Sequence, residues 1–195
     1  MKILHPGASF LEGRASNITS QFGEDGLVQA IHERIGTPNQ WCFEVGAADG
    51  LFFSNTKRLR DAGWNVVLIE GEPRAYAELS KLANEKVRTI QENIGPDSLD
   101  RILAECGAPE DLDLGVIDID GQDYWVLDGM KKFKPRLLMV EFHDSGNVFV
   151  PPLGGPGQAS LATIFNLALS KGWMPLVRTD VNLLCVREEL MGGLC

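Results

Sequence analysis

Short apolar runs alternate with amphipathic stretches through most of this chain. Continuous apolar runs are typical of strands covered by helices on both faces of a parallel sheet, whereas apolar positions three and four residues apart indicate a helix with one buried face. The alternation of the two patterns predicts an α/β fold with parallel strands. Strands are predicted at 41–46, 65–70, 87–90, 113–118 and 136–142, and helices at 54–62, 73–84, 97–106, 122–131 and 159–171.

The last part of the chain departs from this alternation. Residues 173–178 and 182–187 are both strand-like, and they flank the short turn Thr179-Asp180. A turn this short makes the two strands antiparallel neighbours. The predicted sheet is therefore mostly parallel and seven-stranded, with helices on both faces and an antiparallel hairpin formed by the carboxyl-terminal part of the chain.

The amino-terminal part shows little periodicity. Residues 1–19 are expected to form an irregular lead-in to a single domain over 20–195, a length that can bury its own core. Ser20 is a candidate N-cap of a first helix, whose apolar positions stop before Gly36.

The turn after the first predicted strand carries the clearest sign of a ligand site. The run WCFEV (41–45) is followed at once by GAADG (46–50), and glycine allows a backbone approach that a Cβ atom would block. The second strand ends in Glu70, where a Rossmann-type site places an acid that binds ribose hydroxyls. The spacing G-x-x-x-G differs from the dinucleotide pattern G-x-G-x-x-G and disfavours an NAD-dependent reductase. The acid before the turn, Glu44, points instead to S-adenosylmethionine (SAM).

The residues predicted to contact SAM lie at the ends of four successive strands, and some leave an alternative open. Glu44 is expected near the ammonium group of the methionine part, or else in a salt bridge to a neighbouring helix. Glu70 is expected on the ribose, with Glu72 as the second candidate. Asn93 is expected either at the adenine amine or as the cap of the next helix. The full predicted set is Glu44, Gly46, Ala47, Asp49, Gly50, Glu70, Gly71, Asn93 and Asp118.

A second group of polar residues follows the next two predicted strands. Asp118, Asp120 and Asp123 end one strand, Glu141 and His143 end the other, and such strand ends face one crevice. One interpretation is an Mg²⁺ or Mn²⁺ site with the ligands Asp118, Asp120, Glu141 and His143. Another is a metal-free acid/base site, with His143 as the first candidate base and Asp118 or Asp120 as the second. The third is helix capping without chemistry.

Composition disfavours several classes of protein. The net charge of −9 disfavours nucleic acid as the main partner, because phosphate binding relies on lysine and arginine. No apolar run approaches the roughly 18 residues that a membrane span needs, and no signal-peptide pattern is seen. The four cysteines lie far apart without C-x-x-C spacing and are expected to be reduced. We therefore expect a soluble, cytoplasmic protein.

Five segments, taken in order, resemble the FkbM-type SAM-dependent methyltransferases. They are SQFGEDG (20–26), FEVGAADGLFFSNT (43–56), GW with VLIEGEP (63–73), VIDIDGQDYW (116–125) and PRLLMVEFH (135–143). The resemblance spans about residues 20–187. It implies the Rossmann-like class I methyltransferase fold and O-methyl transfer, often to sugar hydroxyls.

The interpretation that combines these observations is a SAM-dependent O-methyltransferase acting on a hydroxyl group of a sugar or glycan-like small molecule. One alternative is a catalytically silent SAM-fold module that serves in binding or assembly, and a less favoured one is an NAD-dependent reductase. Intact acids at Glu44, Glu70, Asp118 and Glu141 argue against a silent module, because a decayed site need not keep them. The expected partners are the acceptor and, in a homo-oligomer, further copies of this chain.

Overall fold

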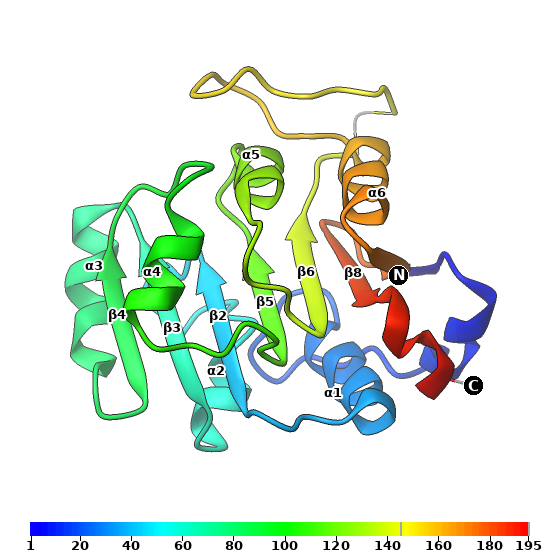
Figure 1. Cartoon of the computed structure of the whole chain (residues 1–195), viewed down its shortest axis with the longest axis horizontal. Helices are drawn as coiled ribbons and strands as arrows, with labels where there is room; N and C mark the ends of the chain where they lie inside the picture. The colour runs from blue at the N-terminus through cyan, green and yellow to red at the C-terminus, as the bar shows by residue number, and fades with distance from the viewer. Residues whose placement is uncertain (145, 195) are drawn as a thin grey trace.

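The computed structural model describes residues 1–144 and 146–194, which form one eight-stranded sheet flanked by helices (Figure 1). The strands are β1 (Lys2–Ile3), β2 (Trp41–Val45), β3 (Asn65–Glu70), β4 (Val87–Gln91), β5 (Leu114–Ile117), β6 (Leu137–Glu141), β7 (Trp173–Arg178) and β8 (Asn182–Arg187). The α-helices are α1 (Glu24–Ile35), α2 (Lys57–Asp61), α3 (Pro73–Leu79), α4 (Leu99–Glu105), α5 (Asp123–Gly129) and α6 (Leu161–Ser170). The 3-10 helices are η1 (Pro6–Leu11), η2 (Ser80–Leu82) and η3 (Glu188–Gly193).

The strand pairing confirms the predicted mixture of parallel and antiparallel strands. The order across the sheet is β1-β7-β8-β6-β5-β2-β3-β4. From β4 to β6 all neighbours are parallel, whereas β8 runs antiparallel to both β6 and β7. Because the parallel strands share one direction, β2, β3, β5 and β6 all end at the same edge of the sheet, which is where such sheets bind ligands.

The sheet separates two apolar cores, one on each face. Helices α1 and α3 contribute residues such as Leu27 and Leu79 to one core. Helices α4 and α6 contribute residues such as Leu103 and Ile164 to the other. Because both faces of the parallel strands are covered, these strands have continuous apolar sequences rather than an alternation of apolar and polar residues.

The amino-terminal lead-in is more regular than predicted. Lys2–Ile3 form β1, which pairs antiparallel with β7 and adds an eighth strand at the sheet edge, and the 3-10 helix η1 follows it. A two-residue strand is too short to show a period in the sequence. The prediction of seven strands and an irregular lead-in missed it for this reason.

The first helix begins later than predicted, because Ser20 does not cap it. The N-cap is Gly23, with a φ of 98°, and the Ser20 hydroxyl accepts a hydrogen bond from Asp25 N at 3.0 Å. The Asp25 carboxylate in turn accepts hydrogen bonds from the backbone N–H groups of residues 18–20. These contacts close the loop before the helix. The predicted stop at Gly36 is confirmed, since this residue is the C-cap with a φ of 74°.

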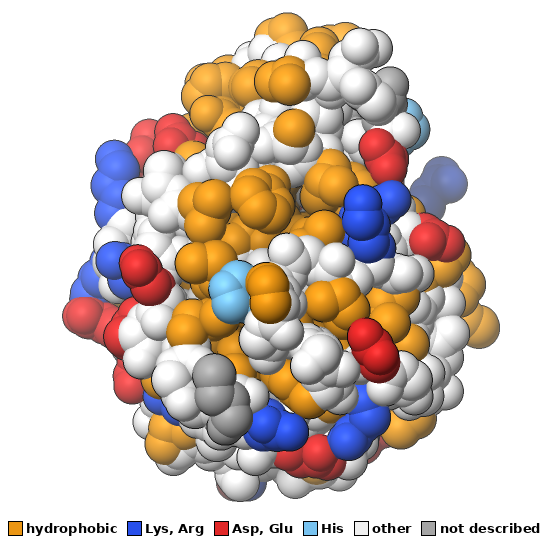
Figure 2. All heavy atoms as spheres, turned by 90° about the vertical axis from the view of Figure 1, so that its right-hand side faces the viewer, with side chains coloured by type: hydrophobic (Ala, Val, Ile, Leu, Met, Phe, Trp, Pro, Cys, Tyr) orange, Lys and Arg blue, Asp and Glu red, His pale blue; other side chains and the backbone are white. Residues whose placement is uncertain are grey.

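Large apolar side chains are exposed in several areas of the surface, one of them in the loop after β2. Residues 146–158, here called the arch, cross over the end of the sheet at which β2 and β6 end, and Val148 and Leu153 on the arch are 76% and 59% exposed (Figure 1). Apolar side chains cover the top of Figure 2, where the arch lies, and a second apolar area surrounds a histidine in the middle of that view. None of the described helices is long and apolar enough to cross a membrane.

Candidate functional site

A cavity of about 630 Å³ lies at the carboxyl ends of β2, β3 and β5. The turn after β2, the end of β3, the segment after β4 and the turn after β5 form its wall. Five of the residues predicted to contact SAM line it, namely Gly46, Glu70, Gly71, Asn93 and Asp118. The order of elements in the sequence therefore brings these residues to one place.

Gly46 allows the turn after β2 to approach β5 closely. It has a φ of 78°, which favours glycine, and an ideal Cβ atom there would lie 1.7 Å from the Asp118 carbonyl oxygen. The backbone N–H groups of Gly46 and Ala47 both donate to the Ile69 carbonyl, at 3.0 and 3.1 Å. The turn is thus fixed between the two neighbouring strands, and a side chain at position 46 would push it away from β5.

Glu70 is held by backbone amides at the end of β3. One carboxylate oxygen accepts a hydrogen bond from Ala48 N at 2.8 Å, and the other accepts one from Glu72 N at 2.7 Å. Each oxygen keeps further acceptor capacity, so the group can still bind two hydroxyls. The Glu72 carboxylate instead caps α3 through Ala75 N at 2.7 Å. The geometry therefore favours Glu70 over Glu72 as the residue that accepts hydrogen bonds from the ribose hydroxyls.

Gly71 and Asn93 lie against one another in the wall of the same cavity. An ideal Cβ atom on Gly71 would lie 2.1 Å from Asn93 Oδ1, so the glycine leaves room for that side chain. The capping interpretation of Asn93 is wrong, because α4 begins at Leu99 with Ser98 as its N-cap residue. The contact of Asn93 with adenine stays a prediction.

A smaller cavity of about 300 Å³ adjoins the first one, and the two share Gly46, Ala48, Asp118 and Asp120. The loop after β2 and the ends of β5 and β6 form its wall. Two of the residues predicted to contact SAM, Glu44 and Ala47, line this smaller cavity and not the larger one.

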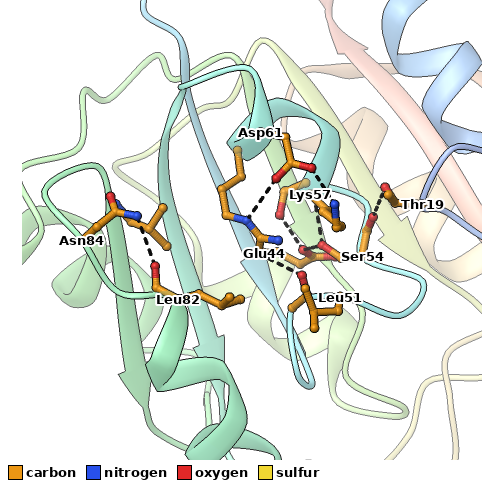
Figure 3. A network of polar contacts seen from close by, with 12 residues as sticks. Thr19, Glu44, Leu51, Ser54, Lys57, Asp61, Leu82 and Asn84 are labelled. Atoms are coloured by element: carbon orange, nitrogen blue, oxygen red, sulfur yellow. Dashed lines mark hydrogen bonds and ion pairs between the residues drawn. The ribbon is translucent and has the colours of Figure 1, made fainter.

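Glu44 is buried below the smaller cavity and is bonded to the loop that follows β2 (Figure 3). Its carboxylate accepts hydrogen bonds from Ser54 Oγ at 2.8 Å, Asn55 N at 2.8 Å and Thr56 Oγ1 at 2.5 Å. Burial raises the pKa of Glu44, and these hydrogen bonds partly offset the rise. Within the described residues Glu44 forms no ion pair, so the predicted salt bridge is wrong. Glu44 fixes this loop, and its contact with an ammonium group stays a prediction.

Asp49 and Gly50, two further predicted contacts, line neither cavity. Asp49 Oδ1 accepts hydrogen bonds from Leu51 N at 2.8 Å and Phe52 N at 3.1 Å, and so closes its own turn. An ideal Cβ atom on Gly50 would lie 2.8 Å from Leu79 Cδ1 of α3. Both residues shape the turn that carries Gly46.

Asp118 and Glu141 form a pair of carboxyl groups beside the smaller cavity. Burial and then the charge of Asp123 raise the pKa of Asp118 to about 7, and a hydrogen bond with Glu141 partly offsets this. Burial and then the charge of Asp118 raise the pKa of Glu141 to about 9. At neutral pH the pair therefore keeps a proton, mainly on Glu141, while Asp118 is partly ionised.

The other two acids of this group, Asp123 and Asp120, have different roles. Asp123 is 1% exposed and accepts hydrogen bonds from Ile119 N at 2.9 Å and Gly121 N at 3.0 Å. It closes the turn between β5 and α5, which is a structural role, but it does not cap the helix, because the N-cap residue is Gln122 and the donors to Asp123 precede α5. Asp120 is exposed, has a φ of 55°, and its backbone N–H donates to Glu141 Oε2 at 3.1 Å. Asp120 therefore holds the end of β6 next to the end of β5.

The structure does not support the predicted Mg²⁺ or Mn²⁺ site. Over residues 1–144 and 146–194, no three His, Cys, Asp or Glu side chains are grouped so that they could hold a metal ion. His143 is exposed and lines neither cavity, and its backbone N–H donates to the Ala159 carbonyl at 2.9 Å. Because β6 ends at Glu141, the chain leaves the sheet before it reaches His143. Asp118 and Glu141 replace His143 as the candidates for acid/base chemistry.

Two glutamines that the sequence analysis did not single out fasten the arch to the cavities. The Gln122 side chain lines the larger cavity and forms three hydrogen bonds, of 2.8, 3.0 and 3.3 Å, with backbone atoms of residues 152–155. Gln158 Nε2 donates to Asp120 Oδ1 at 3.2 Å and to Glu141 Oε2 at 3.0 Å. Glutamines in polar loops carry no sequence signal of their own, since their partners lie far away in the chain.

The raised pKa values predict that the ligand-free protein loses stability as the pH rises from 6.5 to 8. In this range the folded protein keeps protons on Asp118 and Glu141 that the unfolded chain has released, so rising pH favours unfolding. Burial lowers the pKa of His32 to about 4, so His32 affects stability only below about pH 6.5. Between pH 6.5 and 8, the melting temperature of Glu141→Gln should fall less than that of the wild type. Equal pH dependence of the two proteins would contradict the prediction.

Solved structures with the same fold include several methyltransferases. TehB from Haemophilus influenzae aligns with a TM-score of 0.51 and 12% identity, over 83% of this chain and 62% of that protein. A TehB-like SAM-dependent methyltransferase from Corynebacterium glutamicum aligns with a TM-score of 0.52 and 15% identity, over 91% and 92% of the two chains. Fibrillarin from Aeropyrum pernix, solved with natively bound SAM, aligns with a TM-score of 0.54 and 14% identity, over 84% and 73%.

These similarities show that the chain has the Rossmann-like class I methyltransferase fold. No family model and no curated protein matches the sequence. The chain spans 62% of the length of the Haemophilus protein. At such low identity the likeness establishes the fold alone and assigns no role to a residue of this chain.

Proposed function

We propose that this chain is a SAM-dependent O-methyltransferase that acts on a hydroxyl group of a sugar or glycan-like small molecule. One observation carries the proposal: Gly46, Glu70 and Asn93 line a single cavity, and the paired acids Asp118 and Glu141 lie at the cavity that adjoins it. The SAM-dependent methyltransferase from Corynebacterium glutamicum and the SAM-bound fibrillarin among the structural neighbours support SAM as the cofactor.

The larger cavity suits SAM in size and in chemistry. Its volume of about 630 Å³ lies in the range of roughly 300–1,000 Å³ that is usual for small-ligand sites. Asn93, Glu70 and the close backbone turn at Gly46 offer partners for the adenine, the ribose and the methionine part respectively. When bound there, SAM supplies an electrophilic methyl group.

The smaller cavity supplies a group that can take the proton of the acceptor. A hydroxyl oxygen that attacks a methyl group must lose its proton, and a nearby carboxylate accelerates this step. Asp118 lines both cavities, and its pKa of about 7 leaves it partly ionised at neutral pH. Glu141 stays protonated and can donate a hydrogen bond to Asp118. We assign Asp118 as the base and Glu141 as its partner.

Two exposed phenylalanines support a sugar-like acceptor. Phe52 and Phe53 line the smaller cavity and are 76% and 59% exposed. Exposed apolar side chains beside a cavity often mark a ligand-binding surface, and an aromatic ring can pack against the C–H face of a sugar. The resemblance of the sequence to the FkbM-type methyltransferases supports the same class of acceptor.

Calorimetry should detect SAM binding in the micromolar range, about −8 kcal/mol. Glu70→Ala should weaken it by about 1.5–3 kcal/mol, because it removes a charged hydrogen-bond partner from the ribose. The matched control is Glu72→Ala, which should lower the melting temperature through the lost cap of α3 while SAM affinity changes little. Equal affinity of the wild type for NADH and SAM would contradict the cofactor assignment.

The competing hypothesis is a catalytically silent module that binds SAM without transferring its methyl group. The paired acids with raised pKa values at the second cavity disfavour it, because strong pKa shifts cluster at functional sites. Labelled SAM incubated with a panel of free and linked sugars separates the two hypotheses. Binding of SAM without transfer to any of the hydroxyl compounds would favour the silent module.

A further inference from the structure

The wall of the smaller cavity is rich in hydrogen-bond acceptors and carries negative charge. Glu44, Asp118, Asp120 and Glu141 contribute four carboxyl groups, and none of the lining residues that the structure describes is Lys, Arg or His. An anionic ligand would find no counter-charge in this wall. A ligand with hydroxyl or ammonium groups would find several acceptors.

Asn55 adds an unpaired acceptor to this wall. The residue is 7% exposed and lines the cavity, and its Oδ1 atom is buried without a hydrogen-bond partner. A buried polar atom that lacks a partner has lost its hydrogen bonds to water, so such atoms are uncommon in folded proteins. Asn55 thus offers an unpaired acceptor beside the cavity, and a ligand that carries a donor can satisfy it.

Hydrogen bonds hold the loop around Asn55 from two sides, so the backbone that carries the Asn55 side chain is fixed. Its backbone N–H donates to Glu44 at 2.8 Å, and the neighbouring hydroxyls of Ser54 and Thr56 donate to the same carboxylate. On the other side, Thr19 Oγ1 donates to the Ser54 carbonyl at 3.0 Å, as Figure 3 shows. Glu44 thus positions the Asn55 side chain in the wall.

Gln158 shows what kind of group this wall accepts. Its neutral amide N–H group bridges Asp120 and Glu141, so an uncharged donor is already bound at the carboxyl groups. A hydroxyl group of a ligand can form the same hydrogen bonds. The Gln158 side chain of the arch therefore occupies a position where a hydroxyl group of the substrate can bind.

We propose that Asn55 orients the acceptor, by accepting a hydrogen bond from a hydroxyl or ammonium group beside the one that is methylated. The acceptor is then an uncharged or cationic polyhydroxyl compound, and phosphorylated or carboxylated sugars are excluded. This inference rests on the proposed function, because it places the acceptor in the smaller cavity and the cofactor in the larger one.

Three analogues of SAM test the proposal without a known acceptor. They are S-adenosylhomocysteine, which lacks the methyl group, an amino analogue with C–NH₃⁺ in place of S⁺–CH₃, and a carboxymethyl analogue with S⁺–CH₂–COO⁻. In the amino and carboxymethyl analogues the altered group projects to where the acceptor would lie. Calorimetry should show the amino analogue binding about tenfold tighter than S-adenosylhomocysteine, and the carboxymethyl analogue about tenfold weaker than SAM.

Variants at position 55 assign the effect to Asn55. Asn55→Leu should reduce the advantage of the amino analogue over S-adenosylhomocysteine without abolishing it, because the carboxyl groups of the wall remain. Asn55→Asp, which keeps an acceptor, should retain the full advantage. Unchanged affinity for S-adenosylhomocysteine shows that the variants are folded. If the wild type binds the carboxymethyl analogue as well as SAM, or if Asn55→Leu keeps the full advantage, the inference is overturned. If none of the three analogues binds, the proposed function itself fails.

Discussion

Replacement of Gly46 by alanine is expected to abolish SAM binding and to lower the free energy of unfolding by more than about 3 kcal/mol. The new Cβ atom would lie 1.7 Å from the Asp118 carbonyl oxygen, which is a backbone atom that no side-chain rotation can move. The turn would have to leave β5, and the wall shared by the two cavities would open. Chemical denaturation and calorimetry with SAM measure the two effects.

Gly107→Ala is the matched control for this variant. Gly107 has nearly the same φ, 71° against 78°, but an ideal Cβ atom on it meets nothing within 4 Å. It should lose only the cost of the left-handed backbone, about 1–2 kcal/mol, and keep its affinity for SAM. Equal losses in the two variants would mean that backbone conformation, and not the close approach to β5, makes Gly46 necessary.

The strands could be predicted well because their signal is local. β3, β7 and β8 have the predicted bounds, since apolar runs with clear polar or glycine ends define them. Helix ends were predicted less well. The helix predicted at 73–84 is divided into α3, which ends at Leu79, and the 3-10 helix η2. Helix ends depend on packing and on caps, which a single sequence specifies only weakly.

The candidate site could be predicted only in part, because its remaining contacts are tertiary. Glu70 and Gly46 follow from the order of strands and turns, whereas the partners of Glu44 come from a loop ten to twelve residues farther along the chain. The prediction for His143 depended on β6 continuing past Glu141, and the sequence PRLLMVEFH does not mark that end. Asn55 was missed because an unpaired oxygen can be recognised only once its surroundings are known.

The pair of acids gives the second large expected effect. Asp118→Asn should lower kcat at saturating SAM by about 10²–10⁴-fold, the usual contribution of a general base. For the wild type, kcat should rise with pH through about 7, as Asp118 loses its proton. In Glu141→Leu the hydrogen bond that lowers the pKa of Asp118 is lost, so this pKa rises and the rise in kcat should move to higher pH. Initial rates with a sugar that the enzyme methylates, measured from pH 5.5 to 9, give the pH profiles of the wild type and the two variants.

His143→Ala is the control for this assignment, because His143 is exposed and lines neither cavity. It should keep kcat within about twofold, a change far below the factor expected for removal of a base. A larger loss in His143→Ala than in Asp118→Asn would return the role of base to the histidine. Loss of turnover in excess chelator, with recovery on addition of Mg²⁺ or Mn²⁺, would instead show that a metal ion activates the hydroxyl. If Asp118 is the base, neither result is expected. The ionised Asp118 side chain, at the wall shared by the two cavities, then takes the proton without help from His143 or a metal ion.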